Sequence, residues 1–134
     1  MPAQPAPASS QPARILLIED EPAVAAFLRS ALERRGYQIV SSASAAEGLE
    51  LLASHEFRGV ISDFRTPGGM TGADVHAWLL CHKPELSSRV IFITGDTASP
   101  ETTALLAKAE APWVEKPFRV QELIAAVEKT IGKP

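Results

Sequence analysis

Short apolar segments alternate with amphipathic segments along most of the chain. The apolar segments cover residues 15–18, 38–41, 59–62, 89–94 and 112–115. Several of them are apolar at consecutive positions, which is typical of strands buried on both faces of a parallel sheet. The pattern therefore predicts five short parallel β-strands.

Amphipathic helices are predicted in the intervals between these strands. In the first helix, Phe27, Leu28 and Leu32 belong to an apolar stripe with the i, i+3, i+4 spacing of one helix face, so their burial is expected. Comparable stripes predict four further helices. Ser44 is the predicted N-cap of the second helix, and Pro84 is expected to end the third.

The order β-α repeated five times predicts the fold class. Such alternation favours an α/β fold with helices on both faces of a parallel sheet, joined by right-handed crossovers. Five strands suit a doubly wound, flavodoxin-like (βα)5 sheet with strand order 2-1-3-4-5. The folded unit is predicted over residues 14–131. Residues 1–13 are rich in Pro and Ala and predict a disordered linker or tail, and residues 132–134 form a short C-terminal tail.

Composition narrows the class of protein further. Hydrophobic residues make up 46% of the 134 residues and charged residues 22%, which excludes a wholly disordered chain. The formal charge of −3 argues against a global basic field for nucleic acid. Cys81 is the single cysteine, so neither an internal disulfide nor a zinc site built on several thiolates is possible. Because no apolar run approaches ~20 residues, membrane contact is not expected, and a cytoplasmic location is predicted.

Polar residues with related chemistry follow four of the five strands. Glu19 and Asp20 follow the first strand, Asp63 the third, Thr94 ends the fourth, and Lys116 follows the fifth. Ligands of open α/β sheets bind beyond the carboxyl ends of the strands. We therefore expect these five side chains to meet at one edge of the sheet.

The chemistry of this set points to phosphoryl transfer. Crowded carboxylates repel one another and need a cation, and oxygen ligands of this kind suit Mg²⁺ or Mn²⁺. Lys116 supplies a point charge for phosphate, and the Thr94 hydroxyl can donate to a phosphate oxygen. A carboxylate can accept a phosphoryl group as a nucleophile. Asp63 is the best candidate nucleophile, because the other groups would surround it.

Four motifs carry a resemblance to a known family. They are ILLIEDE (15–21), VISDFRTPGGMTG (60–72), VIFITGD (90–96) and WVEKPF (113–118). With them the chain resembles the receiver domain of two-component response regulators over residues 14–131. The resemblance implies that Asp63 is the phospho-acceptor in a phosphorelay. It also implies that the phosphodonor is a phosphohistidine on a histidine kinase or histidine phosphotransfer protein.

The resemblance also implies a metal site. Asp20 and Asp63 would bind Mg²⁺ (or Mn²⁺) through their side chains, Arg65 through its backbone carbonyl, and Glu19 through a metal-bound water. Glu19 stands where Asp is commoner in the family. The side chain of Arg65 is expected either to gate water at the site or to be a surface charge.

Switching residues are a further implication of the resemblance. Thr94 and Lys116 would bind the phosphoryl oxygens, and the family's Lys–Pro bond after the fifth strand is commonly cis. Thr94 and Trp113 would respond to phosphorylation, although Trp113 can equally be a packed strand residue. The expected readout surface, which could also form a homodimer, comprises the helix that opens at 99–101, the strand at 112–115 and the last helix.

The sequence argues against other functions but leaves the parent protein open. An aspartyl hydrolase places D-x-D after the first strand, where this chain has Glu19-Asp20-Glu21, and neither G-x-G-x-x-G nor a Walker loop is present. The chain is expected to be no enzyme beyond its own phosphorylation and dephosphorylation. Three contexts remain open: a receiver from a hybrid sensor histidine kinase, which the Pro/Ala-rich start slightly favours, a stand-alone response regulator, or the truncated receiver of a transcription regulator.

Overall fold

A computed structural model describes residues 13–65, 68–95 and 99–134. The elements follow one another as β1 (Arg14–Ile18), α2 (Pro22–Glu33), β2 (Gln38–Ser42), α3 (Ala45–Ser54), β3 (Gly59–Asp63), α4 (Gly72–His82), α5 (Pro84–Ser87), β4 (Val90–Thr94), α6 (Pro100–Ala109), β5 (Trp113–Glu115) and α7 (Val120–Thr130). All strand pairs are parallel, in the order β2-β1-β3-β4-β5. The predicted flavodoxin-like fold is confirmed. The predicted linker falls almost wholly on residues 1–12, which lie outside the described residues.

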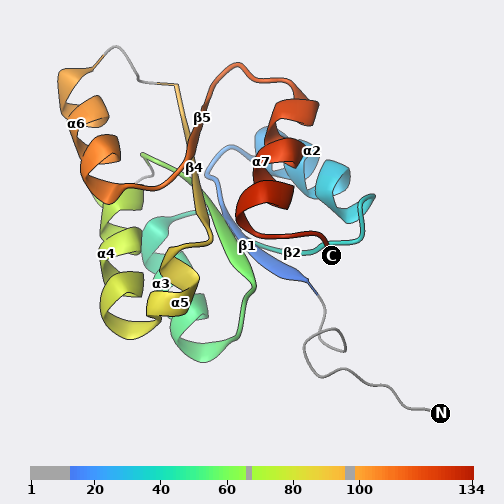
Figure 1. Ribbon diagram of the computed structural model, residues 1–134, viewed down its shortest axis with the longest axis horizontal. Helices are drawn as coiled ribbons and strands as arrows, with labels where there is room; N and C mark the ends of the chain where they lie inside the picture. The colour runs from blue at the N-terminus through green and yellow to red at the C-terminus, as the bar shows by residue number, and fades with distance from the viewer. Residues whose placement is uncertain (1–12, 66–67, 96–98) are drawn as a thin grey trace.

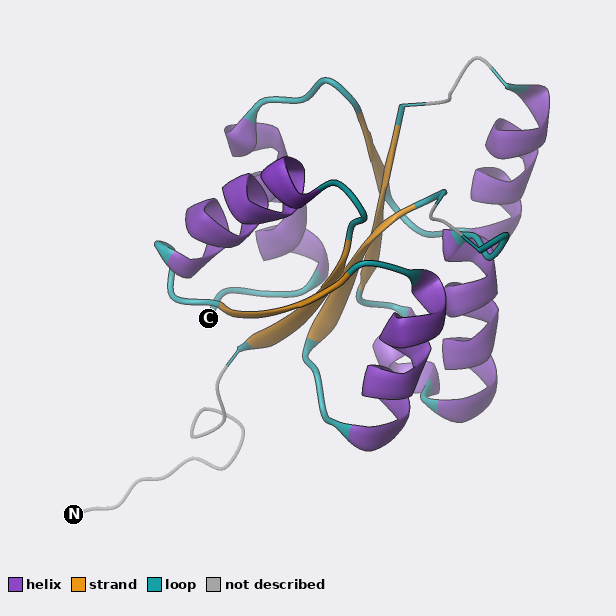
Figure 2. Ribbon diagram, turned by 180° about the vertical axis from the view of Figure 1, so that it is seen from behind, coloured by secondary structure: helices purple, strands orange, loops and turns teal. Residues whose placement is uncertain are grey.

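Helices cover both faces of the sheet (Figure 1). The helices α2 and α7 lie on one face, and α3, α4 and α6 lie on the other, so the sheet forms the middle layer (Figure 2). Two apolar clusters fill the two interfaces: Leu28, Leu32, Leu123 and Val127 pack on one face of the sheet, and Leu52, Val75, Leu79 and Leu106 pack on the other. Within the described part of the chain, no helix has both the length and the apolar character needed to cross a bilayer.

The helix ends agree with the sequence in part. The Ser44 side chain accepts a hydrogen bond from the Glu47 amide, which confirms the predicted N-cap. α4 ends at His82, two residues before Pro84, but Pro84 also begins the one-turn helix α5, which the pattern did not indicate. Pro is well suited to this first helical position, because it has no amide hydrogen to satisfy there.

The expected burial of Phe27 is wrong. Leu28 and Leu32 are fully buried, but Phe27 keeps 56% of its surface in solvent. Neighbouring residues on a helix are rotated by roughly 100° around its axis. Because α2 buries the face centred on Leu28 and Leu32, Phe27 is turned away from the sheet.

The register of the strands brings their polar ends to one edge. Ile18 pairs with Ser62, so the residues that follow β1 lie beside Asp63, the last residue of β3. Thr94 pairs with Glu115, so Lys116 follows directly beside the end of β4. The carboxyl edge of the sheet therefore brings together the five polar residues that the sequence analysis places there.

Candidate functional site

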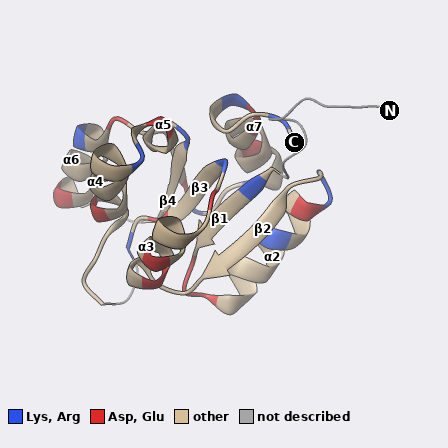
Figure 3. Cartoon of the chain, turned by 90° about the horizontal axis from the view of Figure 1, so that it is seen from below, with Lys and Arg blue, Asp and Glu red and all other residues tan. Residues whose placement is uncertain are grey.

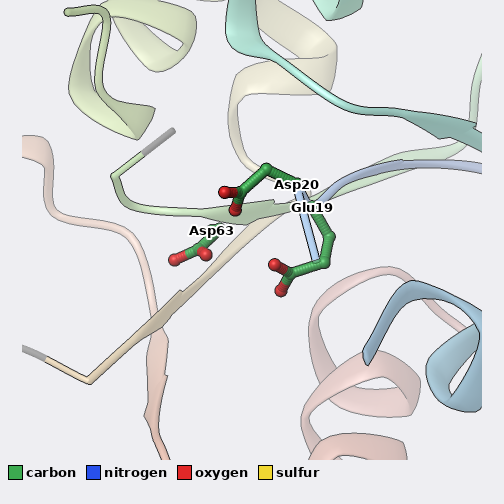
Figure 4. A group of neighbouring side chains, drawn as sticks. All are labelled: Glu19, Asp20 and Asp63. Carbon is green, nitrogen blue, oxygen red and sulfur yellow. The ribbon is translucent and has the colours of Figure 1, made fainter. Parts of the chain in front are cut away.

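Three carboxylates converge at the carboxyl edge of the sheet (Figure 4). Glu19, Asp20 and Asp63 each offer an oxygen, and these oxygens lie within 4.8 Å of one another. Glu19 is buried, Asp63 is partly buried and Asp20 is exposed. The cluster is thus open to solvent on one side and enclosed by protein on the other.

The backbone holds Glu19 in this position. Its amide donates to the Ser42 carbonyl of β2 at 2.9 Å, which continues the pairing of β1 beyond the strand. Its side-chain Oε2 accepts the amide hydrogen of Glu21 at 3.2 Å. The Glu19 carboxylate is therefore oriented from both its main chain and its side chain.

The Lys116 side chain lies beside the carboxylate cluster. Its Nζ lies 3.3 Å from Asp63 Oδ2, 3.4 Å from Glu19 Oε1 and 3.6 Å from Glu21 Oε1. The Lys116 amide donates to the Thr94 carbonyl at 2.7 Å, so the end of β4 positions the lysine. The bond between Lys116 and Pro117 is cis, as the resemblance implies.

The charges at this edge are not balanced. Burial raises the pKa of Asp63, Lys116 opposes that shift, and the nearby Asp20 adds to it. Burial likewise raises the pKa of Glu19. The hydrogen bond from the Glu21 amide lowers this pKa, and the negative charge of Asp63 raises it further. For Lys116, partial burial would lower the pKa, but the charges and hydrogen bonds of Asp63 and Glu19 outweigh it, so its pKa is raised. The acids therefore remain short of positive charge.

A divalent cation fits this donor set. The converging oxygens are hard ligands, and Mg²⁺ is characteristically bound by one or two carboxylates while it keeps waters and phosphate oxygens as its other ligands. The open side at Asp20 leaves room for such ligands, and the raised pKa values show that further positive charge would be favourable. Among the described residues, this is the one group of three or more His, Cys, Asp or Glu side chains close enough to share a metal ion.

Aromatic packing fixes the turn that follows Asp63. The Phe64 ring is fully buried and meets the Phe92 ring edge-to-face at 5.4 Å between centroids. The Phe64 carbonyl accepts the Gly72 amide at 2.7 Å, which closes the turn at the start of α4. A Cβ atom on Gly72 would lie 2.7 Å from the Phe92 ring, so this closure requires glycine. The phospho-acceptor candidate thus lies on a firmly anchored segment.

The remaining predicted site residues occupy distinct places. Thr94 is buried at the end of β4 and joins Lys116 through its carbonyl. Trp113 keeps 43% of its surface in solvent on the edge strand β5, so it is not packed into the core. The Arg65 side chain extends to α6, where its Nη2 donates to Thr102 Oγ1 at 2.7 Å and lies 3.6 Å from Glu101 Oε1.

Sequence reasoning missed two features of this region. Glu21 is a third acidic partner of Lys116, and its place in the run Glu19-Asp20-Glu21 was the signal that could have indicated it. The contact of Arg65 with Thr102 had no signal in the sequence, because it depends on how the turn after β3 lies against α6.

Known proteins resemble this chain in sequence and in fold. The transcriptional regulatory protein KdpE of Mycobacterium tuberculosis is 32% identical over 119 residues, which are 89% of this chain and 51% of KdpE. The response regulator receiver protein CpdR of Brucella abortus is 30% identical over 118 residues, 88% of this chain and 96% of CpdR. The crystal structure of response regulator TrrA from Thermotoga maritima, in complex with Mg²⁺–BeF, has a TM-score of 0.76 at 28% identity and covers 87% of this chain and 97% of that one.

The chain spans about half the length of several transcriptional regulators that it matches, KdpE included. Over residues 15–128 it matches the family described as response regulator receiver domain. That match takes in every strand of the sheet except the first residue of β1, and all of the acidic cluster. The protein therefore belongs to the response regulator receiver domain family.

Proposed function

We propose that this receiver domain accepts a phosphoryl group on Asp63 from a phosphohistidine of a histidine kinase or phosphotransfer protein. The observation that supports it most directly is the position of Asp63, whose Oδ2 lies 3.3 Å from Lys116 Nζ and whose carboxylate clusters with those of Glu19 and Asp20. In the transfer, an Asp63 Oδ atom attacks phosphorus, the phosphorus–nitrogen bond breaks, and the imidazole leaves.

The other residues of the edge bind and orient the transferring group. Lys116 Nζ and the Thr94 hydroxyl would donate to phosphoryl oxygens, and the protein's role is mainly to position groups and balance charge. Mg²⁺, when bound, would neutralise charge on the acceptor and the phosphoryl oxygens. Asp20, Asp63 and the Arg65 carbonyl would hold it directly, and Glu19 would hold one of its waters. The TrrA structure contains Mg²⁺ and a beryllofluoride group, which supports this assignment by similarity.

The readout belongs to the same proposal. The phosphoryl group adds roughly −1.5 to −2 charges and strong hydrogen-bond acceptors. We infer that Thr94 is drawn toward it and that the surface formed by α6, β5 and α7 changes, with exposed Trp113 among the residues that respond. This surface would bind a partner protein or a second copy of the receiver. The proposed location is the cytoplasm, where a histidine kinase and Mg²⁺ would be available.

The parent protein is inferred from the relatives. KdpE is named a transcriptional regulatory protein and CpdR a receiver protein. These names do not support the slight preference for a hybrid histidine kinase that the Pro/Ala-rich start suggested. We propose instead that this receiver works in a response regulator.

Phosphoryl uptake tests the function directly. The protein is incubated with Mg²⁺ and acetyl phosphate, and intact mass is measured under conditions that preserve acyl phosphates. One added phosphoryl group is expected, with none after Asp63→Asn and less after Lys116→Ala. Glu50→Gln, an exposed acid on α3, is the matched control and should react as the unaltered protein does. Full uptake by Asp63→Asn would contradict the proposal.

A further inference from the structure

Arg65 joins the phospho-acceptor segment to α6. It lies two residues after Asp63, and its backbone pairs with Thr71 across the turn. Its guanidinium donates to Thr102 Oγ1 at 2.7 Å and lies 3.6 Å from the Glu101 carboxylate. Both partners belong to the first turn of α6, which lies on the same side of the sheet as α4 (Figure 1). A single side chain therefore connects the proposed site of phosphorylation to a helix of the proposed readout surface.

The two contacts with α6 differ in character. Thr102 is fully buried and offers a neutral hydroxyl oxygen. The Glu101 side chain is 76% exposed, so solvent screens its ion pair with Arg65. Together they hold the guanidinium while the Asp63 carboxylate already has Lys116 as its partner.

A phosphoryl group on Asp63 would change this balance. The Cα atoms of Asp63 and Arg65 can be no more than about 7 Å apart, because only one residue separates them. The arginine side chain is long and flexible enough to turn back toward Asp63. Hydrogen bonds from a guanidinium to phosphoryl oxygens are charge-assisted and frequently bidentate, and they are roughly twice as strong as neutral ones. The added oxygens are therefore better acceptors for Arg65 than the Thr102 hydroxyl or the screened Glu101.

We propose that Arg65 is a tether that changes partner. Before phosphorylation it holds the first turn of α6 through Thr102, and after phosphorylation it moves to the phosphoryl group and releases that turn. This inference rests on the proposed function, since it needs a phosphoryl group on Asp63. It adds a route to α6 that starts from β3, in addition to the route through Thr94 on β4.

Amide hydrogen exchange of the first turn of α6 measures the tether. The Thr102 amide donates to Ser99 Oγ and the Thr103 amide to the Ser99 carbonyl, so both report on this turn. In the unphosphorylated protein, these amides should exchange roughly tenfold faster or more in Arg65→Met and in Thr102→Val, as expected for the loss of one charge-assisted hydrogen bond. Arg34→Met, at the exposed end of α2, is the matched control and should leave the rates unchanged.

Phosphorylation then separates the tether from the underlying function. Each variant is compared with the unaltered protein at the same phosphorylated fraction, which intact mass gives. Phosphorylation should accelerate exchange in the unaltered protein and in Arg34→Met, but add little in Arg65→Met and Thr102→Val. If the mass shows no phosphoryl group on the unaltered protein, the proposed function fails and the change of partner fails with it. If uptake is normal but Arg65→Met still shows the full acceleration, or exchange in the unaltered protein does not rise, the tether is overturned and the proposed function stands.

Discussion

The two edges of the sheet carry opposite charges and use them differently. At the amino edge, a groove of about 720 Å³ is lined by residues that include the cations Arg14, Arg58, Lys83 and Arg89. Figure 3 shows basic positions on this side of the molecule, together with acidic ones. Each of the four cations donates to a main-chain carbonyl; Lys83, for example, bonds to those of Leu52 and His55 at the end of α3.

At the carboxyl edge, acidic side chains predominate and surround a lysine. There Glu19, Glu21 and Asp63 gather around Lys116, and the pKa values of Glu19 and Asp63 are raised. Charges that bond to helix ends and strand ends stabilise the fold, whereas carboxylates held together against their repulsion are available for a ligand. The comparison teaches that the partners of a charge, rather than its presence, separate the structural edge from the functional one.

Mg²⁺ should distinguish the two edges most strongly. A ligand that binds the folded state at one hundred times its Kd increases the free energy of unfolding by about 2.7 kcal/mol. Urea denaturation with and without Mg²⁺ should show this gain in the unaltered protein and a much smaller one in Asp20→Asn or Asp63→Asn. Glu85→Gln, which removes an acid from the amino-edge groove, should retain the full gain. An equal gain in Asp63→Asn would place the metal elsewhere.

Lys83→Met should expose the structural role of the amino edge. It removes the hydrogen bonds from Nζ to the carbonyls of Leu52 and His55, and we expect the free energy of unfolding to fall by about 1–2 kcal/mol. Phosphoryl uptake per folded molecule should not change, because Lys83 lies at the opposite edge from Asp63. Lys129→Met, an exposed lysine on α7, is the control for loss of a positive charge. Reduced uptake at unchanged stability would contradict the division between the edges.

The sequence predicts the carboxyl edge well for a physical reason. Hydrophobic periodicity determines where strands end, and a parallel sheet brings all its carboxyl ends together, so the meeting of Asp63 with Lys116 follows from topology. The strand order and the Ser44 cap follow from equally local or regular rules.

What the sequence could not predict depends on tertiary placement. The prediction that Phe27 is buried was wrong because the width of an apolar stripe does not reveal which part of the stripe faces the sheet. The partner of Arg65 depends on the position of α6 relative to the turn after β3, which no periodicity encodes. The cations of the amino edge gave no pattern either, because most of the hydrogen bonds that they donate go to main-chain carbonyls.

The smallest expected effect concerns the acidic edge without metal. Since the pKa of Asp63 is raised in the folded protein, the unfolded chain loses this proton at a lower pH than the folded protein does. The carboxyl group therefore contributes its full stability below about pH 4, near its unfolded pKa, and that contribution is lost as pH rises through the folded pKa. The amide that Asp63→Asn introduces would not titrate, and its oxygen could still accept a hydrogen bond from Lys116.

Asp63→Asn should accordingly be more stable than the unaltered protein at pH 7 in the presence of a metal chelator. The difference in free energy of unfolding should be of order 1 kcal/mol, a typical size for a single substitution. It should be small near pH 4, grow as pH rises through the folded pKa and then stay constant. Glu19→Gln should follow the same course, because the pKa of Glu19 is raised for the same reason, and Glu50→Gln, which removes an exposed acid on α3, is the matched control. A loss of stability in Asp63→Asn at pH 7 would mean that attraction to Lys116 outweighs the burial and crowding of the acids, and that this edge is balanced in the same way as the amino edge.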